Sequence, residues 1–235
     1  VNGVRVNPRN AYRADPIERK TSVVPVWVEC RSRDTENQED VIVDHHRPND
    51  PGYALSYKDF FKASSLGQVI NLLGIQPTFQ DFVTAATDHC LCDALQGLCP
   101  GVPGQSAHEH SIAQTVTTTG ASETEIIYQM SHFKKMIREA PTIVIDGKEV
   151  LDFRLTNIGV GYSLEYLCLR QVLLGAPHNS IIAHRVSPEE PMMRVVIYGD
   201  PNVVIAFTES WAPKNNLVDT FCVPGRRFGG AYLPL

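Results

Sequence analysis

Two short apolar segments that each end at an ionisable side chain constrain the fold of this chain most strongly. The first, Val23 to Cys30, is rich in β-branched and aromatic residues and includes Glu29 near its end. The second, Val41 to Val43, runs directly into Asp44-His45-His46. Strands of an α/β sheet present ligand-binding side chains in this way, at the carboxyl edge of the sheet. The sequence therefore predicts an α/β fold with a candidate site where the second of these strands ends.

The rest of the chain divides into a helix-rich part and a part with more strand signals. We expect a mostly parallel sheet with flanking helices in a domain of residues 1–140, and a smaller α+β domain over residues 141–235. Thr78 is a candidate N-cap, and Gly74 and Gly97 are candidate helix ends. Asp146-Gly147 is a strong hairpin signal. The predicted helices cover residues 64–73, 79–96, 122–139 and 163–174, the predicted strands cover 142–145, 150–153, 180–184, 194–198 and 220–223, and residues 203–211 fit either type.

Composition and charge exclude several classes of protein. The 43% of hydrophobic residues excludes a disordered chain, and the apolar runs are too short to span a membrane. The formal charge of −5 argues against binding of duplex nucleic acid, which needs a positive surface. The first ten residues lack the apolar region of a signal peptide, and the 6 cysteines are too few for a disulfide scaffold. We therefore expect a cytoplasmic protein.

The residues Asp44-His45-His46 carry the most specific chemical signal. One carboxylate and two imidazoles in a strand-to-loop turn offer oxygen and nitrogen ligands to a divalent cation. A turn relaxes the alternation of strand side chains, so that one histidine can bind a metal while its neighbour contacts a substrate. Asp88-His89 lies in an otherwise apolar predicted helix, where burial of ionisable groups is costly unless they are paired or bound to metal. Asp88 and His89 are therefore further candidate ligands.

Other clusters carry weaker signals. Cys90, Cys92 and Cys99 favour packed thiols, because their spacing lacks the paired knuckles of structural zinc sites. The residues His108 to His110 follow a Gly/Pro-rich segment and fit a solvated loop.

Near the C-terminus, basic residues precede a pair of glycines. The guanidinium groups of Arg226 and Arg227 can bind oxyanions, and the small Gly229 and Gly230 would let backbone N–H groups approach a phosphate. These four residues are therefore the candidate substrate-binding set.

Three patches together resemble the DHH phosphoesterase superfamily: the strand that ends in Asp44-His45-His46, the later helix with Asp88, and the terminal Arg227-Phe228-Gly229-Gly230. Members of that superfamily are metal-dependent hydrolases of phosphodiesters, nucleotides and polyphosphates, with a DHH domain followed by a smaller domain. The early family motif of alternating aspartates is not recognisable here, since the first twenty residues contain only Asp15 and Glu18 as acids.

The resemblance implies a role for each matched residue. His45 would be a metal ligand, His46 a phosphate contact or general acid, and Asp44 a support for the pair. Asp88 would match the later metal-binding aspartate, and Glu29 would stand where the family has an aspartate. The terminal glycine segment would contact phosphate from the second domain.

We therefore expect a hydrolase of a phosphoester, phosphodiester or nucleotide that uses Mn²⁺ or Mg²⁺, with Zn²⁺ as a further option. Its partner would be a small phosphorylated substrate, without duplex nucleic acid or a membrane, and a homodimer is compatible with the sequence. Two alternatives stay open. One is a zinc-dependent hydrolase that uses the region of His89, Cys90, Cys92 and Cys99. The other is a nucleotide- or partner-binding protein that has lost catalysis, which the missing early aspartates favour.

Overall fold

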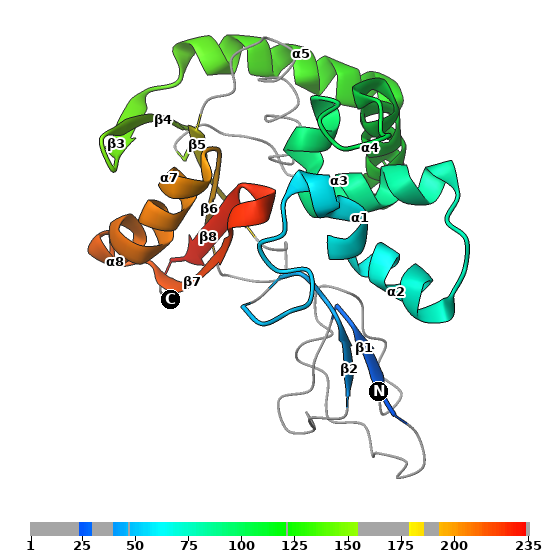
Figure 1. Ribbon diagram of the computed structural model, residues 1–235. Coiled ribbons are helices and arrows are strands. Elements are labelled where there is room, and N and C mark those ends of the chain that lie inside the picture. Colours follow the sequence, from blue (N-terminus) through cyan, green and yellow to red (C-terminus); the bar gives the residue numbers. More distant parts are fainter. Residues whose placement is uncertain are drawn as a thin grey trace, which may run out of the picture.

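The fold of the protein was examined in a computed structural model, which describes residues 24–29, 40–46, 48–120, 122–154, 179–185 and 193–233. It is a mixed α/β structure in which most helices precede the strands of the main sheet (Figure 1). The predicted helix over residues 163–174 lies outside the described residues, and so do Asp15 and Glu18.

The first two strands form a small parallel sheet. Strand β1 (Val26–Val28) pairs with β2 (Val41–Val43), and Val28 lies opposite Val43. Because the strands are parallel, their carboxyl ends meet at one edge. This edge carries Glu29 and Asp44 next to each other in space. In Figure 1 this small sheet lies apart from the main sheet.

Four helical elements follow β2 along the chain. They are the 3₁₀ turn η2 (Tyr57–Asp59), α1 (Phe60–Ala63), α2 (Ser65–Leu73) and α3 (Phe79–Leu95). Helix α2 begins at Ser64, whose Oγ accepts the backbone N–H of Gly67 at 3.1 Å. It ends at Gly74, which has the left-handed φ of 64° that favours glycine. Both ends of this helix therefore lie where the sequence predicts them.

Helix α3 also begins at its predicted cap. The side chain of Thr78 accepts the N–H of Asp81, and the Asp81 carboxylate accepts the N–H of Thr78 at 2.8 Å, which completes a capping box. The helix is interrupted at Cys90, where φ is −145° and ψ is 54°. Gly97, just beyond the helix, has a φ of 70°.

Replacing Thr78 by alanine is expected to lower the free energy of unfolding by about 1 kcal/mol, because the first turn of the helix loses its side-chain acceptor. Chemical denaturation of the purified protein measures this difference. Thr84→Ala is the matched control: the Thr84 hydroxyl donates to the Gln80 carbonyl at 2.9 Å inside the same helix, and alanine is well accepted there. Equal losses for both variants would contradict the role of Thr78 as a cap.

The segment that contains His108 to His110 is a helix, and the predicted solvated loop is wrong. Helix α4 (Gly104–Thr119) begins after Pro103 and ends at Gly120, and α5 (Glu123–Glu139) follows from the cap residue Ser122. Pro103 is compatible with a helix start, but the threonine-rich sequence of α4 has low helix propensity. Packing against α3 therefore decides its conformation, which local sequence does not indicate.

The main sheet has 6 strands in the order β3-β4-β5-β6-β8-β7. Its strands are β3 (Thr142–Ile145), β4 (Lys148–Asp152), β5 (Asn179–Arg185), β6 (Met193–Tyr198), β7 (Val218–Val223) and β8 (Phe228–Tyr232). All neighbouring strands pair antiparallel except β4 and β5. The predicted mostly parallel sheet is therefore not what the described residues form, since parallel pairing is limited to β1–β2 and β4–β5.

The turn between β3 and β4 confirms the hairpin signal. Asp146 and Gly147 have φ values of 50° and 73°, the pair of positive angles that a tight hairpin turn requires. The ambiguous segment 203–211 is helical: α7 (Pro201–Ala206) starts at the cap residue Asp200 and continues through the π-helical η3 (Phe207–Trp211) into α8 (Ala212–Lys214). The 3₁₀ turn η4 (Pro224–Arg226) joins β7 to β8.

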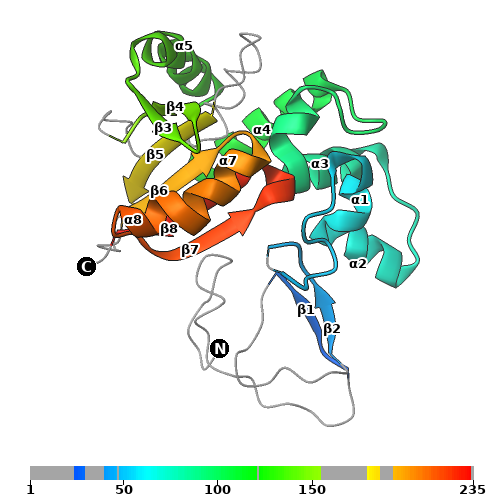
Figure 2. The same ribbon diagram turned by 60° about the vertical axis from the view of Figure 1, so that its left-hand side comes forward.

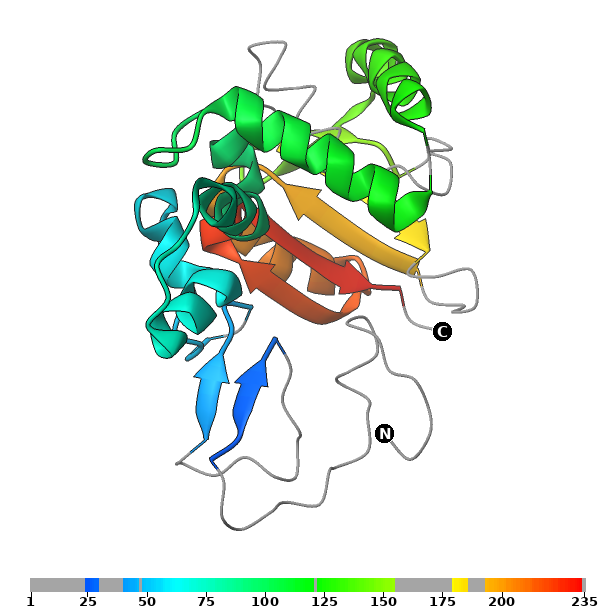
Figure 3. The same cartoon turned by 90° about the vertical axis from the view of Figure 1, so that its right-hand side faces the viewer.

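Both faces of the main sheet are covered. Along β6, Val195 and Ile197 belong to a core with residues of α7, whereas Val196 and Tyr198 belong to a core with residues of α3 and α5. Alternate side chains of a strand point to opposite faces, so a continuous apolar run is needed here. Figure 2 shows α7 and α8 on one face, and Figure 3 shows the helices of the preceding part on the other.

Helices give way to strands close to the predicted domain boundary, since α5 ends at Glu139 and β3 begins at Thr142. One apolar core nevertheless contains residues from both sides, among them Ile126 and Val196. No described helix combines the length and the apolar character needed to cross a membrane.

Candidate metal centre

The turn after β2 is fixed by the carboxylate of Asp44. Its Oδ1 accepts the backbone N–H of His45 at 2.7 Å and that of His46 at 3.2 Å. The same oxygen lies 2.6 Å from Nδ1 of His46, which donates to it. Burial opposes ionisation of Asp44, but the hydrogen bonds from His46 and the backbone lower its pKa below the usual value. Asp44 therefore supports both histidines, as the sequence predicted.

Helix α2 and a nearby glycine hold the same turn from outside. The Nε2 amide of Gln68 donates to the carbonyl of Asp44 at 3.1 Å and to that of Ala63 at 2.8 Å. The N–H of Gly52 donates to the carbonyl of Asp44 at 3.1 Å. These contacts leave little freedom for the side chains of His45 and His46.

Three predicted ligands converge at this turn. Single ligand atoms of Glu29, His45 and Asp88 all lie within 4.8 Å of one another. Nε2 of His45 is 3.8 Å from Oδ2 of Asp88. Among the described residues, this is the group of histidine, cysteine and acidic side chains with the spacing of a metal site. Two carboxylates and one imidazole suit Mn²⁺ or Zn²⁺, and three protein ligands would leave positions open for water or substrate.

The ionisation of these side chains fits ligand binding. Burial lowers the pKa of His45 to about 2, and the charge of Arg226 acts in the same direction, so the imidazole is neutral. A metal ligand must be in this deprotonated form. Burial raises the pKa of Asp88, while the charges of Arg226 and His46 partly offset this effect. His45 is fully buried, whereas Asp88 is partly exposed.

Glu29 reaches the group through an unusual backbone conformation. Its φ of 51° lies in the left-handed region, which costs about 1–3 kcal/mol for a residue other than glycine. Its N–H donates to the carbonyl of Val43 at 2.9 Å, which extends the pairing of β1 and β2 to this residue. Strained backbone of this kind is often found at functional sites, where the surrounding structure enforces it.

His89 does not join this group, although the sequence made it a candidate ligand. Its Nε2 lies 2.9 Å from the carbonyl of Leu55 and donates to it. Burial lowers the pKa of His89 to about 4, and its ring lies edge-on to that of His45, with centroids 5.2 Å apart. His89 therefore packs behind the candidate ligands and anchors the loop that contains Leu55.

The cysteines near His89 are buried thiols, as their spacing favoured. Cys90, Cys92 and Cys99 are free, and Sγ of Cys90 lies 3.1 Å from Sγ of Cys99. The hydrogen-bond contact with Cys99, together with burial, raises the pKa of Cys90. Their ligand atoms form no metal-spaced group with His89, so the geometry does not favour the alternative zinc site.

Arg226 is brought to the candidate centre from η4. Its Nη1 donates to Nε2 of His46 at 3.2 Å and lies 3.5 Å from Nε2 of His45. His46 therefore bridges Asp44 and Arg226, an arrangement that fits the tautomer with its proton on Nδ1. Sequence distance does not indicate this contact, because it joins residues 180 positions apart.

The other predicted substrate contacts are placed differently. Arg227 points to α3, where its Nη2 is 2.9 Å from Oδ1 of Asp93. Gly229 and Gly230 lie inside β8, which is paired with β6 on one side and with β7 on the other. A Cβ atom on Gly229 would lie 2.8 Å from Val204 and one on Gly230 would lie 2.6 Å from the ring of Phe221. These positions do not favour the predicted phosphate-binding role of the two glycines, whose lack of side chains serves packing in the sheet.

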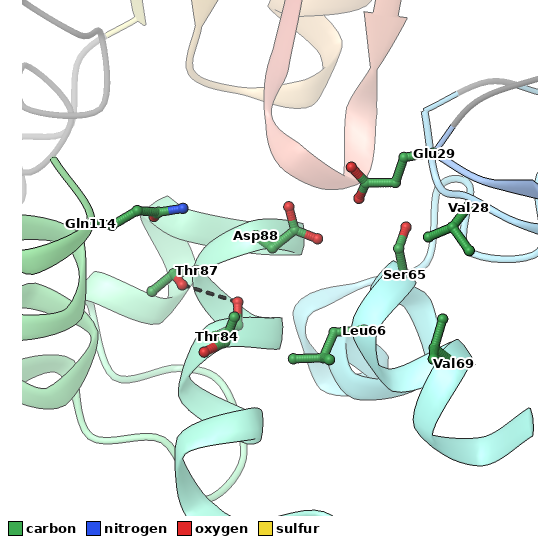
Figure 4. Close-up of a pocket in the computed structure, with 9 residues that line it drawn as sticks. All are labelled: Val28, Glu29, Ser65, Leu66, Val69, Thr84, Thr87, Asp88 and Gln114. Atoms are coloured by element: carbon green, nitrogen blue, oxygen red, sulfur yellow. Dashed lines mark hydrogen bonds between the residues drawn. The ribbon is translucent and has the colours of Figure 1, made fainter. Parts of the chain in front are cut away.

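A pocket of about 300 Å³ opens beside Glu29 and Asp88, whose carboxylates both line it (Figure 4). The remaining lining comes mainly from α2 and α3 and includes apolar Leu66 and Val69. Ser65 lies in the same wall, and its buried Oγ has no hydrogen-bond partner in the described structure. The sequence predicted the helix that begins near Ser65 but gave no sign that this residue lines a pocket.

Because comparisons with known proteins gave no match, the function of this site is interpreted from its geometry and from the sequence. No family model matches the chain, and no curated protein or solved structure was found to match it.

Proposed function

We propose that this protein is a metal-dependent hydrolase of a phosphoester, phosphodiester or nucleotide. The observation that carries the proposal is the convergence of Glu29, His45 and Asp88, with their ligand atoms within 4.8 Å of one another. A divalent cation held there would lower the pKa of a bound water and neutralise charge on phosphoryl oxygens. The resemblance to DHH phosphoesterases leads to the same chemistry from the sequence.

The remaining groups of the centre fit the needs of a phosphate ester. Arg226 offers a guanidinium to the phosphoryl oxygens. Its Nη1 donates to His46, and its charge acts on the nearby carboxylate of Asp88. His46 is partly exposed and held by Asp44. Its Nε2 accepts from Arg226 in the protein without substrate. With Arg226 turned to the phosphoryl oxygens and Nε2 protonated, His46 could contact phosphate or give that proton to the leaving oxygen. Asp44 orients His46 and is itself buried away from solvent.

Metal removal tests this function directly. The purified protein is treated with a chelator, dialysed and assayed on phosphodiesters and nucleotides with Mn²⁺, Mg²⁺ or Zn²⁺ added singly. We expect hydrolysis only when an ion is present. We also expect Mn²⁺ at 100 times its Kd to raise the free energy of unfolding by about 2.7 kcal/mol, since an ion that binds only the folded state stabilises it.

Asp88→Asn is the control for both measurements, because it removes a ligand charge from a partly exposed position. It should lose the activity and the stabilisation by Mn²⁺ while it stays folded. Hydrolysis that persists in excess chelator would overturn the proposal. Ligand binding that needs no metal, without turnover of any substrate, would instead select the non-catalytic binding protein.

A further inference from the structure

The turn between β7 and β8 directs two consecutive arginines to different partners. Arg226 reaches His46, with Nη1 and Nε2 3.2 Å apart. Arg227 reaches Asp93 on α3, with Nη2 and Oδ1 2.9 Å apart. The same helix carries Asp88, so the ion pair of Arg227 with Asp93 fixes the turn on the element that supplies a candidate metal ligand.

The partner of Arg227 is a buried carboxylate. The side chain of Asp93 is only 4% exposed, whereas that of Arg227 is 33% exposed. A buried carboxylate that loses a cationic partner of this kind is strongly destabilised in its charged form. The position of Arg227 next to Asp93 on α3 is therefore more stable than positions in which the Asp93 carboxylate would have no cation beside it.

The turn is rigid enough to transmit this position to Arg226. The N–H of Arg227 donates to the carbonyl of Pro224 at 2.9 Å, and the N–H of Gly199 donates to the carbonyl of Arg227 at 3.1 Å. Arg227 itself has a φ of 56°, which reverses the chain between the two arginines. Gly225 packs against the carbonyl of Leu55, where a Cβ atom would come within 2.6 Å.

Two further contacts between this region and the loop after β2 are uncharged. The hydroxyl of Tyr53 donates to the carbonyl of Cys222 at 3.2 Å, and Gly225 offers close packing without a side chain. Contacts of this kind tolerate small shifts, whereas an ion pair with a buried carboxylate is sensitive to them. The place of the guanidinium of Arg226 therefore depends on Asp93 and Arg227 in addition to its own contacts with the histidines.

We propose that Asp93 and Arg227 are positioning residues: their ion pair holds the turn on α3 so that Arg226 stays against His46, where it can meet a phosphoryl group. The value of this position for catalysis rests on the proposed function. The position itself does not, because it is a property of the protein without substrate.

The position is tested first by NMR of the histidine rings in the chelator-treated protein. The resonance of His46 is assigned with His46→Gln. The variant Arg226→Ala gives the chemical shift of His46 when the guanidinium is absent. We expect Asp93→Asn and Arg227→Gln to move the His46 resonance toward its chemical shift in Arg226→Ala. We expect Arg227→Lys to move it less. Asp152→Asn is the matched control: it removes a carboxylate from a second Asp–Arg pair, 2.7 Å from Arg154, and should leave the resonance unchanged.

The second readout consists of two measurements on the same variants. Calorimetry measures the binding of inorganic phosphate in the presence of Mn²⁺, and kinetic assays measure hydrolysis. We expect Asp93→Asn to weaken phosphate binding and to lower kcat/KM by about 10- to 100-fold. A displacement of about 1 Å in a group that contacts the substrate can lower the rate about 100-fold. Adding Arg226→Ala to Asp93→Asn should then cost little more. In the native background, Arg226→Ala alone should cause most of the same loss.

Each outcome decides one of the two proposals. An unchanged His46 resonance in folded Asp93→Asn and Arg227→Gln would overturn the positioning role, and so would an effect of Arg226→Ala that is equally large in both backgrounds. A native protein that neither binds phosphate nor hydrolyses any ester would overturn the proposed function, while the NMR result would still decide the positioning role.

Discussion

Replacing His45 by glutamine is expected to lower kcat/KM for the metal-dependent hydrolysis by about 1,000-fold. The imidazole is the one nitrogen donor in the group with Glu29 and Asp88. Its loss should remove several kcal/mol of the transition-state stabilisation that the bound ion supplies. A 1,000-fold decrease corresponds to about 4 kcal/mol. Steady-state kinetics with saturating Mn²⁺ measure the effect. Calorimetry of Mn²⁺ binding should show a parallel loss.

His89→Gln is the matched control for this prediction. Both imidazoles are fully buried, and their rings are neighbours, but His89 donates to the carbonyl of Leu55 and has no place among the candidate ligands. The amide of glutamine can also donate to that carbonyl. We expect a stability loss of about 1–2 kcal/mol with Mn²⁺ binding retained. Equal loss of Mn²⁺ binding in both variants would contradict the assignment of His45.

Gly52→Ala is expected to cause the largest loss of stability, about 3 kcal/mol or more. A Cβ atom at Gly52 would lie 1.9 Å from the carbonyl oxygen of Ala63 and 2.8 Å from Cβ of His45. Both obstacles are tied to the main chain, so the loop after the two histidines would have to move. Urea denaturation measures the loss, and a variant that does not fold at all agrees with the prediction.

Gly74→Ala controls for the general effect of a new methyl group. Gly74 has open space around its Cβ position, and only its φ of 64° opposes alanine, which costs about 1 kcal/mol. If Gly52→Ala destabilises the protein no more than Gly74→Ala does, the close packing of Gly52 against His45 does not hold in solution.

Features that depend on neighbours in the chain were predictable. Thr78 and Asp81 cap α3 through groups three residues apart, and Asp146-Gly147 forms its turn from its own backbone preferences. A shared site for Glu29 and His45 was implied by the family resemblance, and the parallel pairing of β1 with β2 brings their two strand ends to one edge.

Features that depend on partners far along the chain were not predictable. Gly229 and Gly230 have the composition of a phosphate loop, but strands β6 and β7 pair with them on both sides and occupy their backbone groups. The loop predicted around His108 is a helix because α3 packs against it. A short local sequence pattern determines neither the register of strand pairing nor the element against which a helix packs.

The sequence by itself determined the helix caps, the hairpin turn and the set of side chains able to bind a metal, since these follow from residue type and short spacing. Only the tertiary structure decided which of them meet. It placed Arg226 against His46, paired Arg227 with Asp93, and turned His89 toward Leu55. Contacts of this kind depend on the packing of whole elements, where buried charges and hydrogen-bonding groups must find partners wherever the fold brings them.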